Sequence, residues 1–104
     1  MEQFTLTVKF TANTENYEQF RQELVALFDI VKNEENFVSG VLHQNIQKQE
    51  EFLVYEIWND NVEHFLNVQL KKPYAVVWDK LLVEMDIKRE PAIYTAFAKL
   101  GIEK

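Results

Sequence analysis

The sequence predicts an α+β fold with the element order β-α-β-β-α-β, in which helices pack on one face of a four-stranded antiparallel sheet. Segments of period two, typical of strands, alternate along the 104 residues with segments whose apolar residues recur every three or four positions. A short polar loop at residues 47–51 joins two of the strands, so we expect them to pair antiparallel. A chain of this length predicts a single domain, residues 1–104, that is large enough to bury a core.

The first strand and the first helix are predicted by a change of period. Residues 4–10 alternate between apolar and polar side chains, which indicates a strand with one buried face. We expect the helix to start at Asn13 or Thr14, with Glu15 and Glu18 stabilised near its N-terminus by the helix dipole. The apolar stripe of this helix would consist of Tyr17, Phe20, Leu24, Leu27, Phe28 and Val31.

A β-hairpin is predicted next, followed by a second helix in two parts and a last strand. After a turn at residues 36–40, residues 41–46 and 52–58 form the hairpin strands. Asp60 and Glu63 have the spacing of a capping box at the start of a helix. The helix is interrupted near residues 70–73 and resumes at Pro73, which suits a first helical turn. Residues 87–97 form the last strand, and Pro91 favours an edge position for it.

This order of elements is that of the ferredoxin-like folds. Both faces of the third strand are rich in apolar side chains: Leu53, Tyr55 and Ile57 on one, Phe52, Val54 and Trp58 on the other. The predicted helices cover only one face of the sheet, and a wide apolar face exposed to water is unfavourable. We therefore expect a homodimer in which the sheets of two copies pack face to face.

Composition excludes several classes of partner and site. The chain has 11 Lys and Arg against 17 Asp and Glu, a net charge of −6 that repels nucleic acid and anionic membrane surfaces. It has no cysteine, which agrees with a reducing cytoplasm and leaves no thiolate for catalysis or zinc binding. The N-terminal residues alternate instead of forming an apolar run, so we expect neither an export signal nor a membrane span. No phosphate-binding loop, metal-ligand cluster or nucleophilic Ser constellation is visible.

The hairpin sequence resembles the antibiotic biosynthesis monooxygenase domain proteins of the dimeric α+β barrel superfamily. The resemblance covers nearly the whole chain and is carried by residues 42–44, by the strand from Phe52 to Trp58, and by the helix that starts two or three residues later. It implies a cofactor-free oxygenase of quinols or anthrones, a haem-degrading enzyme, or an isomerase of small phosphorylated signal molecules.

The second helix departs from the family pattern, because the two histidines that many members carry in and after it are missing. By offset from Trp58, Asn67 and Tyr74 stand near those positions. Val77 or Trp78 stands roughly where haem-degrading relatives have their axial histidine. Haem is therefore disfavoured, since the iron needs a ligand atom aimed at it.

The predicted catalytic residues are His43, Asn67 and Tyr74. His43 would act as the base, and hydrogen bonds from Tyr74, Tyr55 or Asn67 would stabilise charge on the substrate oxygen. If the hairpin register brings Glu56 beside His43, the carboxylate would raise the basicity of the imidazole. Substrate-binding walls would come from Phe28, Trp58 and Trp78, with Tyr55 and Glu56 beside them.

Each of these residues also has a structural interpretation. For His43 it is a hydrogen bond across the hairpin or a place in the dimer interface, and for Glu56 it is a pair with a cation or with backbone donors. For both tryptophans it is a core position. For His64 we expect an exposed helical position. We expect the pocket between the sheet and the two-part helix, lined by His43, Trp58, Tyr74 and Trp78.

The expected function is oxidation of a small electron-rich aromatic substrate by dioxygen, with no cofactor. Without flavin or metal the substrate itself must supply the electrons, so it must be a phenol, hydroquinone or anthrone. Two alternatives remain open. One is an isomerase or lyase of a small oxygenated metabolite, and the other is a non-catalytic homodimer that binds a small ligand.

Overall fold

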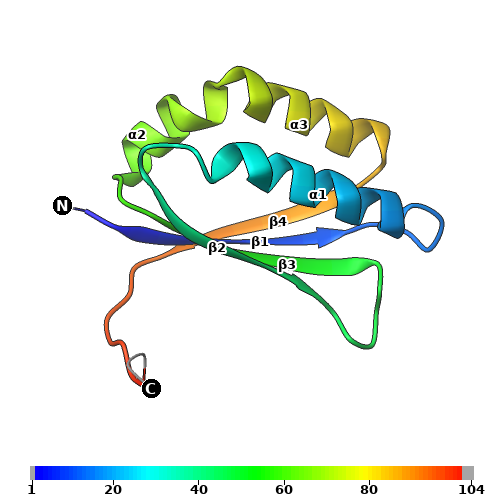
Figure 1. Cartoon of the computed structure of the whole chain (residues 1–104), viewed down its shortest axis with the longest axis horizontal. Coiled ribbons are helices and arrows are strands. Elements are labelled where there is room, and N and C mark those ends of the chain that lie inside the picture. Colours follow the sequence, from blue (N-terminus) through cyan, green and yellow to red (C-terminus); the bar gives the residue numbers. More distant parts are fainter. Residues whose placement is uncertain (1, 102–104) are drawn as a thin grey trace.

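A computed structural model describes residues 2–101 and shows helices on one face of an antiparallel sheet (Figure 1). The strands are β1 (Phe4–Thr11), β2 (Phe37–Gln44), β3 (Glu51–Trp58) and β4 (Lys88–Tyr94), in the order β2-β3-β1-β4 across the sheet. The helices are α1 (Tyr17–Val31), α2 (Val62–Asn67), the short 3₁₀ turn η1 (Gln69–Lys71) and α3 (Pro73–Glu84). The α+β, ferredoxin-like architecture predicted from the sequence is confirmed.

The element boundaries differ from the prediction at the start of α1 and before the hairpin. The prediction that the first helix starts at Asn13 or Thr14 is wrong, since Asn16 is the N-cap and α1 begins at Tyr17. Residues 37–40, predicted as part of a turn, belong to β2, which pairs with β3 and carries a bulge between Phe37 and Ser39. The α2 cap also lies one residue later than predicted. Asn61, not Asp60, accepts a hydrogen bond from the His64 backbone amide at 2.8 Å. Asp60 instead accepts from the His64 ring at 2.9 Å, which holds the exposed imidazole at the start of the helix.

The break in the second helix was predicted correctly, and it positions the site. α2 ends at Asn67, η1 follows, and α3 begins with Pro73 in its first turn. Because η1 is tighter than an α-helix, it rotates the chain between the two helical parts. As a result Gln69 is turned inward and is only 5% exposed.

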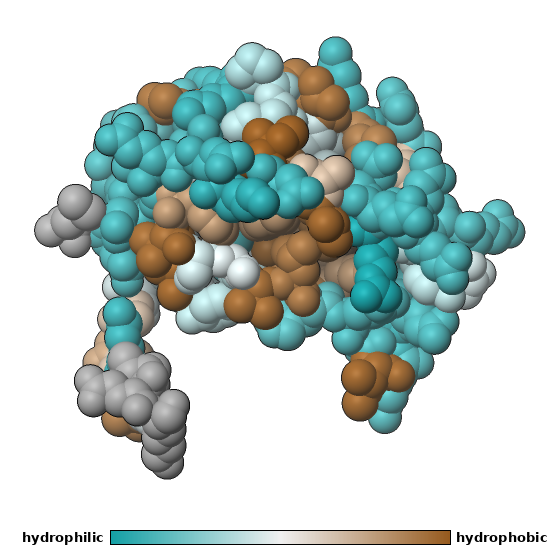
Figure 2. All heavy atoms as spheres, viewed as in Figure 1, coloured by the Kyte–Doolittle hydropathy of each residue, from teal (hydrophilic) through white to brown (hydrophobic). Residues whose placement is uncertain are grey.

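The core lies between the helices and the sheet. Its centre is aromatic: the Phe20 ring of α1 contacts Phe10, Phe52 and Trp78, with ring centroids 5.3 to 5.7 Å apart. In the space-filling view the helical layer is mainly hydrophilic outside, and apolar side chains gather below it, toward the sheet (Figure 2). Among the described residues no helix is long and apolar enough to cross a membrane.

The pairing register of the strands determines which side chains lie on each face of the sheet. β3 pairs with β1 through Glu56 and Leu6, and with β2 through Glu56 and Gly40, so these positions share the face toward the helices. The other face carries His43 opposite Leu53, and Val41 opposite Tyr55. No described element covers this second face, which we call the open face (Figure 1).

Candidate active site

A cavity of about 110 Å³ lies between the sheet and the helices, in the middle of the core. Its walls are largely apolar and aromatic, with Phe28 from α1, Trp58 from β3 and Trp78 from α3. Four polar side chains also line it: Glu56, Gln69, Tyr74 and Arg89. A mostly apolar cavity with a few converging polar groups is the usual form of a small-molecule site.

Glu56 is the buried carboxyl group of this cavity. Its side chain is 7% exposed, and its Oε1 atom accepts a hydrogen bond of 2.9 Å from the Trp58 indole nitrogen. Burial raises its pKa from 4.5 to about 7, and the hydrogen bond from Trp58 offsets only part of this effect. Near neutral pH the group can therefore both accept and return a proton, which is what a general acid–base catalyst must do.

A second polar group of residues lies where α1 and β2 are joined, against η1 and α3. The Gln69 amide nitrogen donates to the Tyr74 hydroxyl at 2.6 Å and also to Glu34. Lys72 pairs with the same Glu34 oxygen at 2.6 Å. Burial acts to raise the pKa of Glu34, but the hydrogen bonds from Lys72 and Gln69 outweigh it, so the pKa lies below its usual value and the carboxylate stays ionised.

The Tyr74 hydroxyl stays protonated in this setting. Burial, with a further contribution from the charges of Glu34 and Glu56, raises its pKa to about 12. Because Gln69 already donates to this oxygen, the phenolic proton points to another acceptor. The nearest one, Glu34, is 3.4 Å away, which is long for such a bond. A substrate oxygen in the cavity can therefore compete for this proton.

The structure brings five of the eight predicted site residues to the cavity: Phe28, Glu56, Trp58, Tyr74 and Trp78. It does not bring His43 there, so the prediction of one pocket lined by His43, Trp58, Tyr74 and Trp78 is wrong for His43 in the protomer. Its side chain is exposed on the open face, where Nδ1 lies 3.1 Å from the Leu53 carbonyl oxygen. Glu56 faces the helices, so it cannot orient His43.

Two further predicted residues also lie elsewhere. Tyr55 is on the open face with His43, because positions two apart in a strand share a face. Asn67, at the end of α2, is exposed and lines none of the hollows found in the described residues. Gln69, which is not among the predicted site residues, lies in the cavity instead. A signal was available, since Gln69 follows the buried Phe65 by one helical turn.

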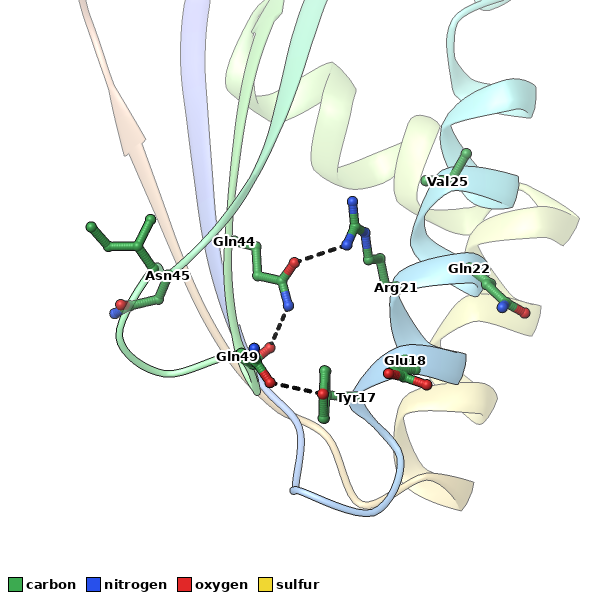
Figure 3. Close-up of a pocket in the computed structure, with 9 residues that line it drawn as sticks. Tyr17, Glu18, Arg21, Gln22, Val25, Gln44, Asn45 and Gln49 are labelled. Atoms are coloured by element: carbon green, nitrogen blue, oxygen red, sulfur yellow. Dashed lines mark hydrogen bonds between the residues drawn. The ribbon is translucent and has the colours of Figure 1, made fainter.

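A larger hollow, about 830 Å³, opens on the surface between α1 and the end of the hairpin (Figure 3). Its polar side chains hydrogen-bond to one another. Arg21 donates to the side-chain amide oxygen of Gln44 at 3.1 Å, and the Tyr17 hydroxyl donates to the side-chain amide oxygen of Gln49 at 2.8 Å. None of the residues that line this hollow belongs to the predicted site. The central cavity is therefore the stronger candidate for chemistry.

Comparison with known proteins gives one family and a common fold. The family model described as antibiotic biosynthesis monooxygenase matches residues 3–68. No curated protein matches the chain by sequence.

Solved structures match over nearly the whole chain. A mutant of SnoaB, a cofactor-independent oxygenase from Streptomyces nogalater, has a TM-score of 0.83 at 18% identity, over 97% of this chain and 99% of that one. A conserved protein from Methanosarcina mazei has a TM-score of 0.79 at 21% identity, over 93% and 95% of the two chains. PA3566 from Pseudomonas aeruginosa has a TM-score of 0.75 at 20% identity, over 93% and 97%. At these identities the likeness establishes the fold.

Proposed function

Because the chain belongs to the antibiotic biosynthesis monooxygenase family, we propose that it oxidises a small electron-rich aromatic substrate with dioxygen and needs no cofactor. The observation that carries the proposal is Glu56, a carboxyl group with a pKa of about 7 in an aromatic cavity. The cofactor-independent activity named for SnoaB, which has the same fold, supports the proposal.

The proposed role of the protein is to make and shelter a substrate anion. Ionised Glu56 accepts a proton from the substrate, and the Tyr74 hydroxyl donates a hydrogen bond to the substrate oxygen that gains negative charge. The anion gives one electron to dioxygen, and the resulting radical and superoxide combine to a carbon-bound peroxide. The proton held by Glu56 returns to the peroxide, which loses water. One oxygen atom stays on the substrate carbon, and the other leaves as water.

This role for Glu56 replaces His43 as the proposed base. A general base must lie within hydrogen-bond reach of the proton that it removes. His43 is on the far side of the sheet from the cavity, whereas Glu56 forms part of the cavity wall. Phe28, Trp58 and Trp78 would contact the faces of a flat substrate and exclude water from the anion.

Oxygen uptake by the purified protein, with a chelator present and hydroquinones and anthrones as substrates, tests the proposal. We expect uptake faster than autoxidation for at least one substrate. The variant Glu56→Gln keeps the shape and the hydrogen bond to Trp58 but cannot accept the proton, so it should lose roughly 10²–10⁴-fold in turnover. Uptake no faster than autoxidation across the panel would contradict the oxygenase, and full activity of the variant would remove Glu56 from the mechanism.

We also propose that the protein is a homodimer formed through the open face. Leu53, Tyr55 and Val41 are each 40 to 49% exposed there, side by side in the register of β2 and β3. Their burial against a second copy would remove a contiguous apolar surface from water. Light scattering at micromolar concentration should then give twice the protomer mass of 12.4 kDa. A mass of 12.4 kDa would contradict the dimer.

A further inference from the structure

The central cavity continues into a second hollow toward the edge of the sheet. This outer groove, about 500 Å³, lies between α2, α3 and the edge strand β4. The two hollows share walls, among them Phe65, Ala75 and Trp78. A molecule bound in the cavity can therefore extend into the groove without leaving the protein.

The two hollows differ in chemistry. The cavity holds all the polar groups of the proposed mechanism, whereas the residues that line only the groove are, apart from Asp79, apolar: Leu66, Pro91, Ala92 and Ile93. The charge of Asp79 is matched by Arg89, whose guanidinium group donates to it at 2.8 Å. The groove thus offers apolar contact area and no unpaired charge among its described residues.

Size limits what each hollow can hold. An apolar cavity of about 150 Å³ is known to bind one benzene molecule, so the cavity of about 110 Å³ has room for a single ring after small side-chain movements. Three fused rings would not fit within the cavity itself. The groove, in contrast, is in the range of about 300–1,000 Å³ that is usual for ligand sites.

From these observations we infer that the substrate is a single-ring phenol or hydroquinone carrying an apolar chain, with the ring in the cavity and the chain in the groove. The inference rests on the proposed function for the position of the ring, because Glu56 and Tyr74 are taken to meet the phenolic oxygen. The groove is then the specificity site, and it selects substrates by apolar contact with their alkyl chain.

Binding of 4-alkylphenols, from methyl to hexyl, tests the inference without turnover. Isothermal titration calorimetry should show affinity that rises roughly two- to fourfold for each added methylene, because each one leaves water for the groove. From methyl to hexyl the gain should be at least about 30-fold. Alkylhydroquinones with the same chains should show a matching fall in KM in the oxygen assay.

A matched pair of variants separates the groove from general hydrophobic binding. Leu66 lines only the groove, and Val76 on α3 lines none of the described hollows, yet the two are similarly exposed, at 45% and 43%. Leu66→Asp should weaken hexylphenol binding at least about tenfold and leave methylphenol binding unchanged, because the charge lies beside the chain and not beside the ring. Val76→Asp should leave both affinities unchanged.

The outcomes distinguish the inference from the proposed function. Chain-length dependence that Leu66→Asp abolishes, without oxygen uptake, would support the groove and contradict the oxygenase. Oxygen uptake with no chain-length dependence would overturn the inference and leave the oxygenase standing. If affinity does not depend on chain length and Leu66→Asp changes the mass in solution, the groove is a contact between copies, and the inference is likewise wrong.

Discussion

The two faces of the sheet carry similar chemical groups in opposite surroundings. On the face toward the helices, Glu56 is 7% exposed and accepts a hydrogen bond from Trp58 inside an aromatic cavity. On the open face, His43 is exposed and hydrogen-bonded to a backbone carbonyl oxygen. A histidine ordinarily titrates nearer neutrality than a glutamate, yet burial brings the pKa of Glu56 to about 7. Residue type alone therefore does not identify the candidate base: burial brings a carboxyl group near neutrality, and only Glu56 of the two lines the cavity.

The largest expected effect separates the two faces by activity. Glu56→Gln should lower turnover roughly 10²–10⁴-fold, because it removes the proposed base from the cavity. His43→Gln, its counterpart on the open face, should change turnover less than about twofold. Both are measured by oxygen uptake on the same substrate. A large loss in His43→Gln with an unchanged mass in solution would contradict the assignment of the site to the helical face.

The pH dependence of the same reaction provides a control. Because the base must be ionised, kcat/KM should rise with pH and level off above a pKa of about 7. The residual activity of Glu56→Gln should lack this rise.

The second prediction compares the faces by stability. The pKa of Glu56 is about 7 in the folded protein against 4.5 ordinarily, so the folded state binds the proton more tightly. Proton binding by Glu56 therefore stabilises the folded protein. This contribution to the free energy of unfolding is fully present below pH 4.5 and is lost as the pH rises through about 7, a difference of ~3 kcal/mol. Glu56→Gln should therefore unfold at higher urea than the wild type at pH 8, and at similar urea at pH 4.

The control for this measurement is Glu90→Gln, at an exposed position paired with Lys9 in the register of the open face. It should lose stability between pH 4 and pH 8 as the wild type does. The measurements need one protein concentration, because a dimer gains stability by mass action. Equal pH dependence in wild type and Glu56→Gln would show that burial does not displace the titration of Glu56.

The third prediction compares one tyrosine from each side of the sheet, Tyr74 of α3 and Tyr55 of β3. Tyr74→Phe should lower kcat about tenfold, because the substrate oxygen loses one hydrogen bond to a protonated phenol, worth ~1–1.5 kcal/mol. Tyr55→Phe, on the open face, should leave kcat within about twofold. If the two variants have equal kcat values, the Tyr74 hydroxyl does not stabilise charge in the reaction.

The smallest effect on the stability of the protomer is expected for a substitution on the open face. Leu53→Lys should change the free energy of unfolding of the isolated protomer by no more than ~0.5 kcal/mol, because the side chain is already 45% exposed. It should nevertheless shift the mass in solution from dimer to protomer, since a charge would be buried in the proposed interface. Val83→Lys, exposed on α3, is the control and should leave the mass unchanged. An unchanged mass in Leu53→Lys would place the interface elsewhere.

The type and order of the elements follow from local patterns in the sequence. The alternation in residues 4–10 and the spacing from Tyr17 to Val31 report which side chains avoid water, and that preference is local to each segment. The break before Pro73 was predictable for the same reason, because proline fits a first helical turn wherever the helix lies in the fold. The signal that Glu56 faces inward was also present, since it stands two positions from both Val54 and Trp58 and therefore shares their buried face.

Only the tertiary structure decided which chemical groups meet. A shift of one residue in strand pairing turns every side chain to the other face, and the hairpin register pairs Glu56 with Gly40 and His43 with Leu53. The burial that brings the pKa of Glu56 to about 7 comes from helices distant in the sequence. Gln69 enters the site through the rotation of η1, which depends on how α2 and α3 pack together on the sheet. Local periodicity determines which face of an element is buried, but proximity and desolvation arise only when the elements assemble.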